Sequence, residues 1–299
     1  MGRVGVEHLH RIPPRSRPTQ ANGAEHVRAD PSGGVVPTAH GVHVTSYAGA
    51  MNPTADSPDA VDSTPVVLVH GWGGSFTTTW ERSGFTMLLA DANRPVIGVD
   101  LLGHGDAPKP HDPEAYGDLA AGVLQAIDDA VGPDGDPVDA VGFSLGAMTL
   151  IRAAMQRPGR FRRLVLAGVG NNVFERDEEA TAAIVAAIES DSDTSDHDAD
   201  NRARLFAQYA HQPGNDPVAL AAIMKRPPSQ LLRPADLAAI TCPVLVAVGD
   251  RDFVLPAEPL VDALPDARFV SLKRTDHFAT PESFAFIDAT LEFLDAVPG

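Results

Sequence analysis

The chain has 299 residues, of which 43% are hydrophobic, enough for one large α/β domain or two average ones. Its net charge of −17 at pH 7 disfavours nucleic acid and anionic membranes as partners, because those surfaces are themselves negative. Apolar runs end after about six residues, whereas roughly 20 are needed to cross a bilayer. Since there is no apolar signal segment and only one cysteine, Cys242, we expect a cytoplasmic protein without an internal disulfide.

The composition of charged residues is biased. The chain has 40 acidic and 23 basic residues, Asp is more frequent than Glu, and Arg is more frequent than Lys. GC-rich coding is one explanation of this bias. The composition also resembles that of cytosolic proteins from halophiles that accumulate salt, in which dense carboxylates keep the protein soluble. This resemblance implies function at high salt, because at about 1 M salt the Debye length is only about 3 Å and self-repulsion is screened.

The first part of the chain gives weak structural signals. Residues 1–34 are rich in Pro, Arg, Gly and His without periodicity, which predicts a disordered N-terminal arm. Short extended segments follow at 35–38 and 41–47, with His40-Gly41 as the predicted hairpin turn. A polar connector then leads into the first strongly apolar run.

From residue 66 onward, strands and helices alternate. Short runs rich in Val, Leu and Ile predict strands at 66–69, 96–99, 138–142, 163–167, 244–248 and 268–272. Helical periodicity predicts helices near 76–91, 115–131, 145–157, 257–264 and 281–296. This alternation is typical of a parallel sheet covered by helices on both faces. Because such sheets bind ligands beyond the carboxyl ends of their strands, we expect the chemistry in the loops there.

The strand pattern is absent between about 171 and 237, where helical periodicity appears at 175–190, 201–211 and 216–226. The acidic run 191–200 joins the first two of these segments, and we interpret it as a solvated loop rather than a cation site. A helical block between two sheet strands predicts a cap over the carboxyl edge of the sheet.

One motif suggests a nucleophile. Residues 140–148, AVGFSLGAM, place Ser144 in a Gly-x-Ser-x-Gly pattern between a predicted strand and a predicted helix. A serine on such a turn adopts strained backbone angles, and Gly142 and Gly146 let strand and helix pass closely. The helix that follows directs its amide N–H groups and positive dipole end at the serine, which suits an anionic intermediate.

A nucleophilic serine needs a base and a group that orients the base, in the chain order Ser, then Asp or Glu, then His. His277, after the last predicted strand, is the only histidine beyond His211 and is the predicted base. Asp250 and Asp252 both follow strand 244–248, and spacing alone does not choose between them.

The tetrahedral intermediate of such a reaction needs backbone donors. The first strong strand ends in the glycine-rich HGWGGS, whose amides can lie beside the nucleophile. The backbone N–H groups of Trp72 and Leu145 are therefore the predicted oxyanion hole. The side chains of Trp72 and Phe143 are candidates for the substrate pocket.

Taken together, VLVHGWGGS, VIGVDLLGHGDAPKP, AVGFSLGAM, and PVLVAVGDRDFVLP with TDHF resemble the α/β-hydrolase superfamily. The resemblance implies a mostly parallel central sheet flanked by helices, with a core at 35–170 and 238–299 and a helical cap at 171–237. In such proteins the acid commonly stands in a Gly-x-x-Asp-x-x-x-Pro pattern. Gly249 and Pro256 frame Asp252 in this way, so the resemblance favours Asp252 over Asp250.

The function that the resemblance implies is hydrolysis of a carboxylic ester or a similar small acyl substrate through an acyl-enzyme. Ser144 would be the nucleophile, His277 the base and Asp252 the orienting acid, with no metal or organic cofactor. Lactone opening, C–C bond hydrolysis and perhydrolysis are alternatives on the same fold, as is a non-catalytic receptor or scaffold. The sequence leaves the substrate and the oligomeric state open.

Overall fold

The computed structural model describes residues 36–37, 42–45, 62–190, 201–228 and 230–298. The predicted N-terminal arm, the predicted turn at His40-Gly41 and the acidic run 191–200 lie outside the described residues. The two flanking segments of the predicted hairpin do pair, since β1 and β2 are antiparallel with Val36 opposite Val44.

The described strands form one sheet in the order β1-β2-β4-β3-β5-β6-β7-β8. Their bounds are Val36–Pro37 (β1), Val42–Thr45 (β2), Val66–Val69 (β3), Val96–Val99 (β4), Val138–Phe143 (β5), Phe161–Ala167 (β6), Val244–Gly249 (β7) and Ala267–Leu272 (β8). The six strands from β3 to β8 run parallel, and β2 pairs antiparallel with β4. The predicted mostly parallel α/β architecture is confirmed.

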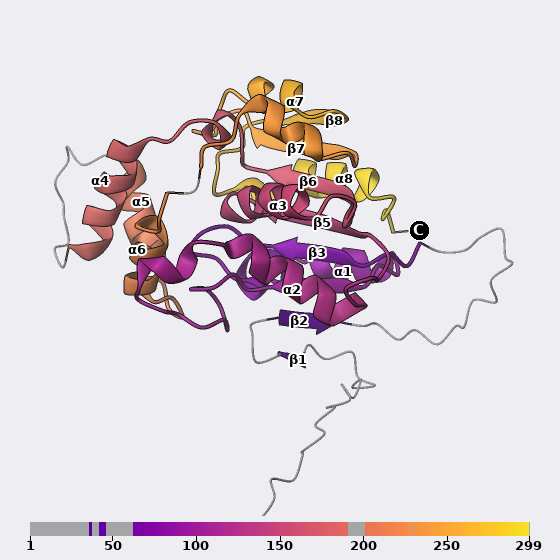
Figure 1. The fold of residues 1–299 in the computed structure, drawn as a ribbon, viewed down its shortest axis with the longest axis horizontal. Coiled ribbons are helices and arrows are strands. Elements are labelled where there is room, and N and C mark those ends of the chain that lie inside the picture. Colours follow the sequence, from indigo (N-terminus) through magenta and orange to yellow (C-terminus); the bar gives the residue numbers. More distant parts are fainter. Residues whose placement is uncertain (1–35, 38–41, 46–61, 191–200, 229, 299) are drawn as a thin grey trace, which may run out of the picture. The chain divides into compact units, whose positions relative to one another are not determined.

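Side chains alternate between the two faces of each strand, and the core divides accordingly. The helices outside the segment between β6 and β7 are α1 (Phe85–Asp91), α2 (Leu119–Val131), α3 (Leu145–Gln156), α7 (Glu258–Ala263) and α8 (Phe284–Phe293). Val67 and Val69 of β3 pack in the apolar cluster that includes α2 and α3, which lie on the near side of the sheet in Figure 1. Val66 and Leu68 pack in the second cluster with side chains of α1 and α8. Fully buried strands thus lie between two helical layers.

The predicted helix 76–91 is wrong in one respect, because it is divided into two pieces. A single wide turn at Thr77–Glu81 is followed by α1, and Gly84 separates them with a positive φ of 78°. A left-handed residue cannot continue an α-helix, and glycine adopts that conformation at little steric cost. The predicted helix 115–131 likewise begins later, at Leu119, because Asp118 caps it by accepting a hydrogen bond from the Ala121 N–H at 3.1 Å.

Between β6 and β7 the described chain contains helices and no strand. These are α4 (Glu178–Glu189), α5 (Asn201–Ala210) and α6 (Pro217–Met224), with short helical turns at Asn171–Val173 and Pro234–Ala239. We call α4, α5 and α6 the inserted helices. Figure 1 shows them together at the left, beyond the ends of the strands.

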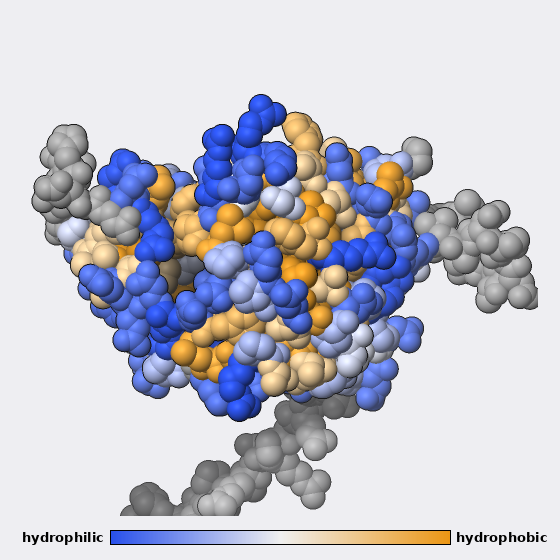
Figure 2. Space-filling model, turned by 90° about the horizontal axis from the view of Figure 1, so that it is seen from above, coloured by the Kyte–Doolittle hydropathy of each residue, from blue (hydrophilic) through white to orange (hydrophobic). Residues whose placement is uncertain are grey.

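The surface is mixed in polarity. On the face seen in Figure 2, hydrophilic residues interleave with hydrophobic ones. No helix in the described ranges is both long enough and apolar enough to span a membrane.

Candidate active site

The strand order creates a switch point between β3 and β5. From β3 the chain crosses to β4 on one side, and from β5 onward it adds strands on the other side. The loops that follow β3 and β5 therefore diverge, which opens a crevice at their carboxyl ends, where open α/β sheets bind ligands. The HGWGGS segment follows β3 and Ser144 follows β5, so the sheet topology brings the two predicted site segments together.

Ser144 occupies a strained turn. Its φ of 51° and ψ of −110° lie outside the regions that non-glycine residues prefer. Its N–H donates to the Ala167 carbonyl at 2.8 Å, and its own carbonyl accepts the Met148 N–H at 3.0 Å, which begins α3. A Cβ on Gly146 would lie 2.3 Å from the Val69 oxygen, so only glycine permits this approach of α3 to β3. The turn presents the hydroxyl at the carboxyl edge.

Three predicted side chains form one hydrogen-bonded chain. His277 Nε2 lies 2.9 Å from Ser144 Oγ, and His277 Nδ1 lies 3.0 Å from both carboxylate oxygens of Asp252. Because an ionised carboxylate only accepts, Nδ1 carries the proton and Nε2 is free to accept the serine proton. Asp252 is itself held by the Val254 N–H at 3.0 Å, and both Asp252 and His277 are 4% exposed.

The two candidate acids have different environments. Asp252 lies in the loop after β7 with its carboxylate against the His277 ring, whereas Asp250 is exposed and uses its backbone N–H to bond Leu272. A tight turn explains the difference. The Asp252 N–H donates to the Gly249 carbonyl, and this turn directs the Asp252 side chain inward. The geometry favours Asp252.

The predicted oxyanion donors are the backbone N–H groups of Leu145, directly after Ser144, and of Trp72, in the segment after β3. Leu145 is the first residue of α3, where helix geometry leaves N–H groups without intrahelical acceptors. Among the described residues, neither the Leu145 nor the Trp72 N–H donates a hydrogen bond. A Cβ on Gly71 would lie 2.7 Å from the Phe143 ring, so the segment that carries Trp72 packs directly on the end of β5. The two N–H groups remain candidate donors to an oxyanion.

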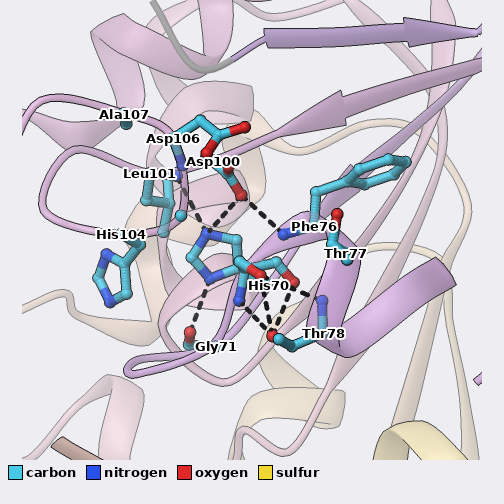
Figure 3. A network of polar contacts seen from close by, with 12 residues as sticks. His70, Gly71, Phe76, Thr77, Thr78, Asp100, Leu101, His104, Asp106 and Ala107 are labelled. Carbon is cyan, nitrogen blue, oxygen red and sulfur yellow. Dashed lines mark hydrogen bonds and ion pairs between the residues drawn. The ribbon is translucent and has the colours of Figure 1, made fainter. Parts of the chain in front are cut away.

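A buried polar network holds the segment after β3, as Figure 3 shows. The Leu101 N–H donates to His70 Nε2 at 3.1 Å, so the proton of His70 is on Nδ1, which donates to the Gly71 carbonyl at 2.7 Å. Asp100 accepts the N–H of Phe76 at 2.7 Å and that of Asp106 at 2.8 Å. The network fixes the backbone immediately before Trp72.

His104 lies beside His70 in the same region, and its pKa is strongly lowered. Its ring centroid lies 4.9 Å from that of His70. Burial, together with the neighbouring His70, lowers the pKa of His104 to about 3. The ring is therefore neutral at physiological pH and packs as part of the turn, which leaves His277 as the histidine at the serine.

A small cavity of about 50 Å³ adjoins Ser144 and His277. Trp72 and Phe143, the two predicted pocket residues, both line it. Three aromatic residues that the sequence did not single out also line it: Phe206, Tyr209 and Phe278. Phe206 and Tyr209 are three residues apart on α5. Their spacing indicates that the two side chains share one face of a helix. It does not indicate whether that face points toward the site.

The inserted helices contact the segment after β3. Trp72 Nε1 donates to the Leu220 carbonyl of α6 at 3.2 Å, and the Trp72 ring lies 5.2 Å from that of Phe206.

Within the described ranges, no group of three or more His, Cys, Asp or Glu side chains is arranged to hold a metal ion.

A parallel sheet with a strained serine turn at its switch point, followed in chain order by an acid and a histidine, defines an alpha/beta hydrolase. The model of the alpha/beta hydrolase family matches residues 66–289. The chain belongs to this family and is an enzyme of it.

Two curated relatives are pimeloyl-[acyl-carrier protein] methyl ester esterases. The one from Methylococcus capsulatus is 33% identical over 217 residues, covering 67% of this chain and 80% of the relative. One from Neisseria meningitidis is 29% identical over 244 residues, covering 74% and 88%. The solved structure of an enol-lactonase from Burkholderia xenovorans LB400 superposes with a TM-score of 0.61 at 19% identity, covering 80% of this chain and 94% of that one. At that identity it shows the shared fold.

Proposed function

We propose that the chain is a serine hydrolase that cleaves carboxylic esters through an acyl-enzyme. Ser144 is the nucleophile, His277 the general base and acid, and Asp252 the group that orients His277. The observation that carries this proposal is the unbroken hydrogen-bond chain from Asp252 through His277 to Ser144 on a strained turn. The esterases among its relatives support an ester as the substrate.

In the first half of the reaction, Ser144 Oγ attacks the carbonyl carbon while its proton passes to His277 Nε2. The carbonyl oxygen becomes an oxyanion, which the backbone N–H groups of Trp72 and Leu145 bind. His277 then gives the proton to the departing alkoxide, which leaves as an alcohol. An acyl group remains on Ser144.

In the second half, a water molecule attacks the acyl carbonyl and passes a proton to His277 Nε2. The second tetrahedral intermediate collapses, the Ser144 oxygen leaves and recovers that proton, and the carboxylic acid is released. Asp252 stabilises the imidazolium in both halves without itself becoming protonated. Phe143 and Phe253, whose rings lie 5.0 Å and 4.4 Å from that of His277, shield the ion pair from water.

We assign residues 171–237 as a cap that completes the pocket above this site. The contacts of Trp72 with Leu220 and Phe206 support that assignment, because they join α6 and α5 to the loop that carries an oxyanion donor. Phe206 also lines the cavity at Ser144, so the inserted helices help to determine which substrates fit.

The proposal is tested with Ser144→Ala, which removes the nucleophile and retains a small side chain on the turn. We expect loss of turnover on short p-nitrophenyl esters, with an unchanged circular dichroism spectrum. A fluorophosphonate probe should label the wild-type chain at Ser144 and leave the variant unlabelled. Retained hydrolysis by the variant, or turnover of lactones or diketones only, would contradict the proposal.

A further inference from the structure

The segment after β3 contains a tight turn at residues 71–74. The Gly74 N–H donates to the Gly71 carbonyl at 3.1 Å, and Gly73 has a positive φ of 74°. A positive φ at the third position is typical of a type II turn, and glycine adopts it at little steric cost. We call residues 71–74 the oxyanion turn, because its second residue, Trp72, carries one of the two proposed oxyanion donors.

The two ends of the oxyanion turn are held by different parts of the molecule. At its beginning, His70 Nδ1 donates to the Gly71 carbonyl at 2.7 Å (Figure 3). Near its end, Asn215 Nδ2 donates to the Gly73 carbonyl at 2.8 Å. His70 belongs to the core, whereas Asn215 lies between the inserted helices α5 and α6. The hydrogen bond from Asn215 therefore joins the turn to the inserted helices.

Asn215 is well placed to hold the turn. Its Nδ2 also donates to the carbonyl of Tyr209, in the last turn of α5, at 3.0 Å. Because both partners are carbonyl oxygens, the amide nitrogen and not the amide oxygen must face them. The backbone N–H of Asn215 donates to the Gln212 carbonyl at 3.1 Å, so the residue is itself fixed in the chain after α5.

Side-chain packing brings the same elements together. A Cβ on Gly73 would lie 2.9 Å from the Tyr209 ring, so this ring packs directly on the oxyanion turn. The indole of Trp72 donates to the Leu220 carbonyl of α6 at 3.2 Å. Glycine has the fewest steric limits on its backbone angles, so Gly73 depends on such outside contacts to keep one conformation.

We propose that Asn215 is a positioning residue, which holds the oxyanion turn so that the Trp72 N–H points at the oxyanion. This inference rests on the proposed ester hydrolysis at Ser144. Asn215 is absent from the residues that line the cavity at Ser144, so it acts through the turn and not on the substrate. Catalysis therefore depends on the seating of the inserted helices, because a displacement of about 1 Å can cost about 100-fold in rate.

The kinetic test compares Asn215→Ala, which removes both hydrogen bonds, with Asn215→Gln, which keeps an amide donor. The oxyanion forms in both halves of the reaction, so acylation and deacylation should slow together. We expect Asn215→Ala to lower kcat for p-nitrophenyl acetate about 10- to 100-fold while KM changes less than about twofold. Asn215→Gln should recover part of kcat.

The matched control is His111→Ala. His111 Nε2 lies 2.8 Å from Asp216 Oδ2, so this variant removes a contact between the neighbouring residue and the loop after β4. It leaves the oxyanion turn untouched and should leave kcat unchanged. An equal loss of kcat in His111→Ala would overturn the inference, because any loosening of the inserted helices would then have the same effect.

A transition-state analogue separates positioning of the turn from simple capping of α5. Ser144 Oγ adds to the carbonyl carbon of hexyl trifluoromethyl ketone, its proton passes to His277 Nε2, and the ketone oxygen becomes an oxyanion beside Trp72. In Asn215→Ala the Ki of this ketone should rise by about the factor by which kcat/KM falls. A lower Tm with unchanged Ki and kcat would show that Asn215 only caps the helix, and the inference would be wrong.

Amide hydrogen exchange, measured by NMR, gives a readout that needs no turnover. Asn215→Ala should speed exchange of the Gly74 N–H, which closes the oxyanion turn, and His111→Ala should not. If the wild type hydrolyses esters but Asn215→Ala leaves kcat, Ki and this exchange unchanged, the inference fails while the proposed reaction stands. If no ester is hydrolysed and the exchange difference persists, Asn215 holds the turn as inferred and the proposed reaction is wrong.

Discussion

At the residue scale, the candidate site depends on one backbone conformation and two hydrogen bonds. The positive φ of Ser144 costs free energy that the surrounding contacts of α3 and β6 offset. This strain turns the hydroxyl toward His277, and the Asp252 carboxylate fixes the tautomer that can accept its proton. A serine in an ordinary helix or strand would have neither the exposure nor the alignment.

Asp252→Asn should lower kcat by about 10⁴-fold, because an amide beside Nδ1 stabilises the wrong tautomer of His277. Asp250→Asn is the matched control two residues away, and it should leave the rate unchanged because Asp250 is exposed and the hydrogen bonds of His277 Nδ1 go to Asp252. Steady-state kinetics on a short p-nitrophenyl ester measures both. If Asp250→Asn loses kcat while Asp252→Asn retains it, the acid is Asp250 and the assignment is wrong.

At the element scale, the close approach of α3 to the end of β3 places Leu145 beside the segment that carries Trp72. Gly146 makes this possible, since a Cβ there would lie 2.3 Å from the Val69 oxygen and 2.6 Å from the His70 oxygen. The network of His70 and Asp100 then holds the same segment from the other side (Figure 3). In the proposed mechanism, both elements hold the two backbone donors at one oxyanion.

Gly146→Ala should destabilise the protein by about 1–3 kcal/mol, as overpacking does, and lower kcat by moving α3 away from β3. Gly122→Ala is the control, because Gly122 lies exposed in α2 with nothing within 4 Å of an added Cβ. That variant should stabilise the protein by about 0.5–1 kcal/mol, the helix preference for alanine, with kcat unchanged. Chemical denaturation and kinetics compare the pair; equal stability of the two variants would count against the steric account.

At the scale of the whole molecule, the dominant property is the net charge of −17. Like charges across one surface repel, and the repulsion weakens as the Debye length falls from about 30 Å at 0.01 M salt to about 3 Å at 1 M. We therefore predict that the stability of this acidic chain depends on the salt concentration of its solvent.

The free energy of unfolding should rise steeply as KCl increases from about 0.01 M to 1 M, and activity should rise with it. Sucrose is the control, because it favours the compact state by exclusion from the surface without screening charge. Thermal unfolding followed by circular dichroism measures both series. Full stability and activity at low salt would leave the acidic composition to coding bias alone.

The strands and the nucleophile turn could be predicted because their signals are local. All six parallel strands begin within two residues of their predicted positions, since apolar runs of Val, Leu and Ile have few other ways to be buried. The helix at 76–91 was predicted as continuous because periodicity does not register the left-handed conformation that Gly84 adopts. The same limit applies to α2, whose start at Leu119 depends on the Asp118 cap.

The sequence by itself determined the fold family and the order of Ser144, an acid and His277, because the strand runs and the Gly-x-Ser-x-Gly turn are encoded in adjacent residues. Only the tertiary structure decided that Asp252 rather than Asp250 meets His277, and that Phe206 of α5 lines the cavity at the serine. The physical reason is that contacts between distant segments, such as Ser144 and His277, arise from strand order and helix packing. Local propensities and residue spacing do not predict which side chains this packing brings into contact.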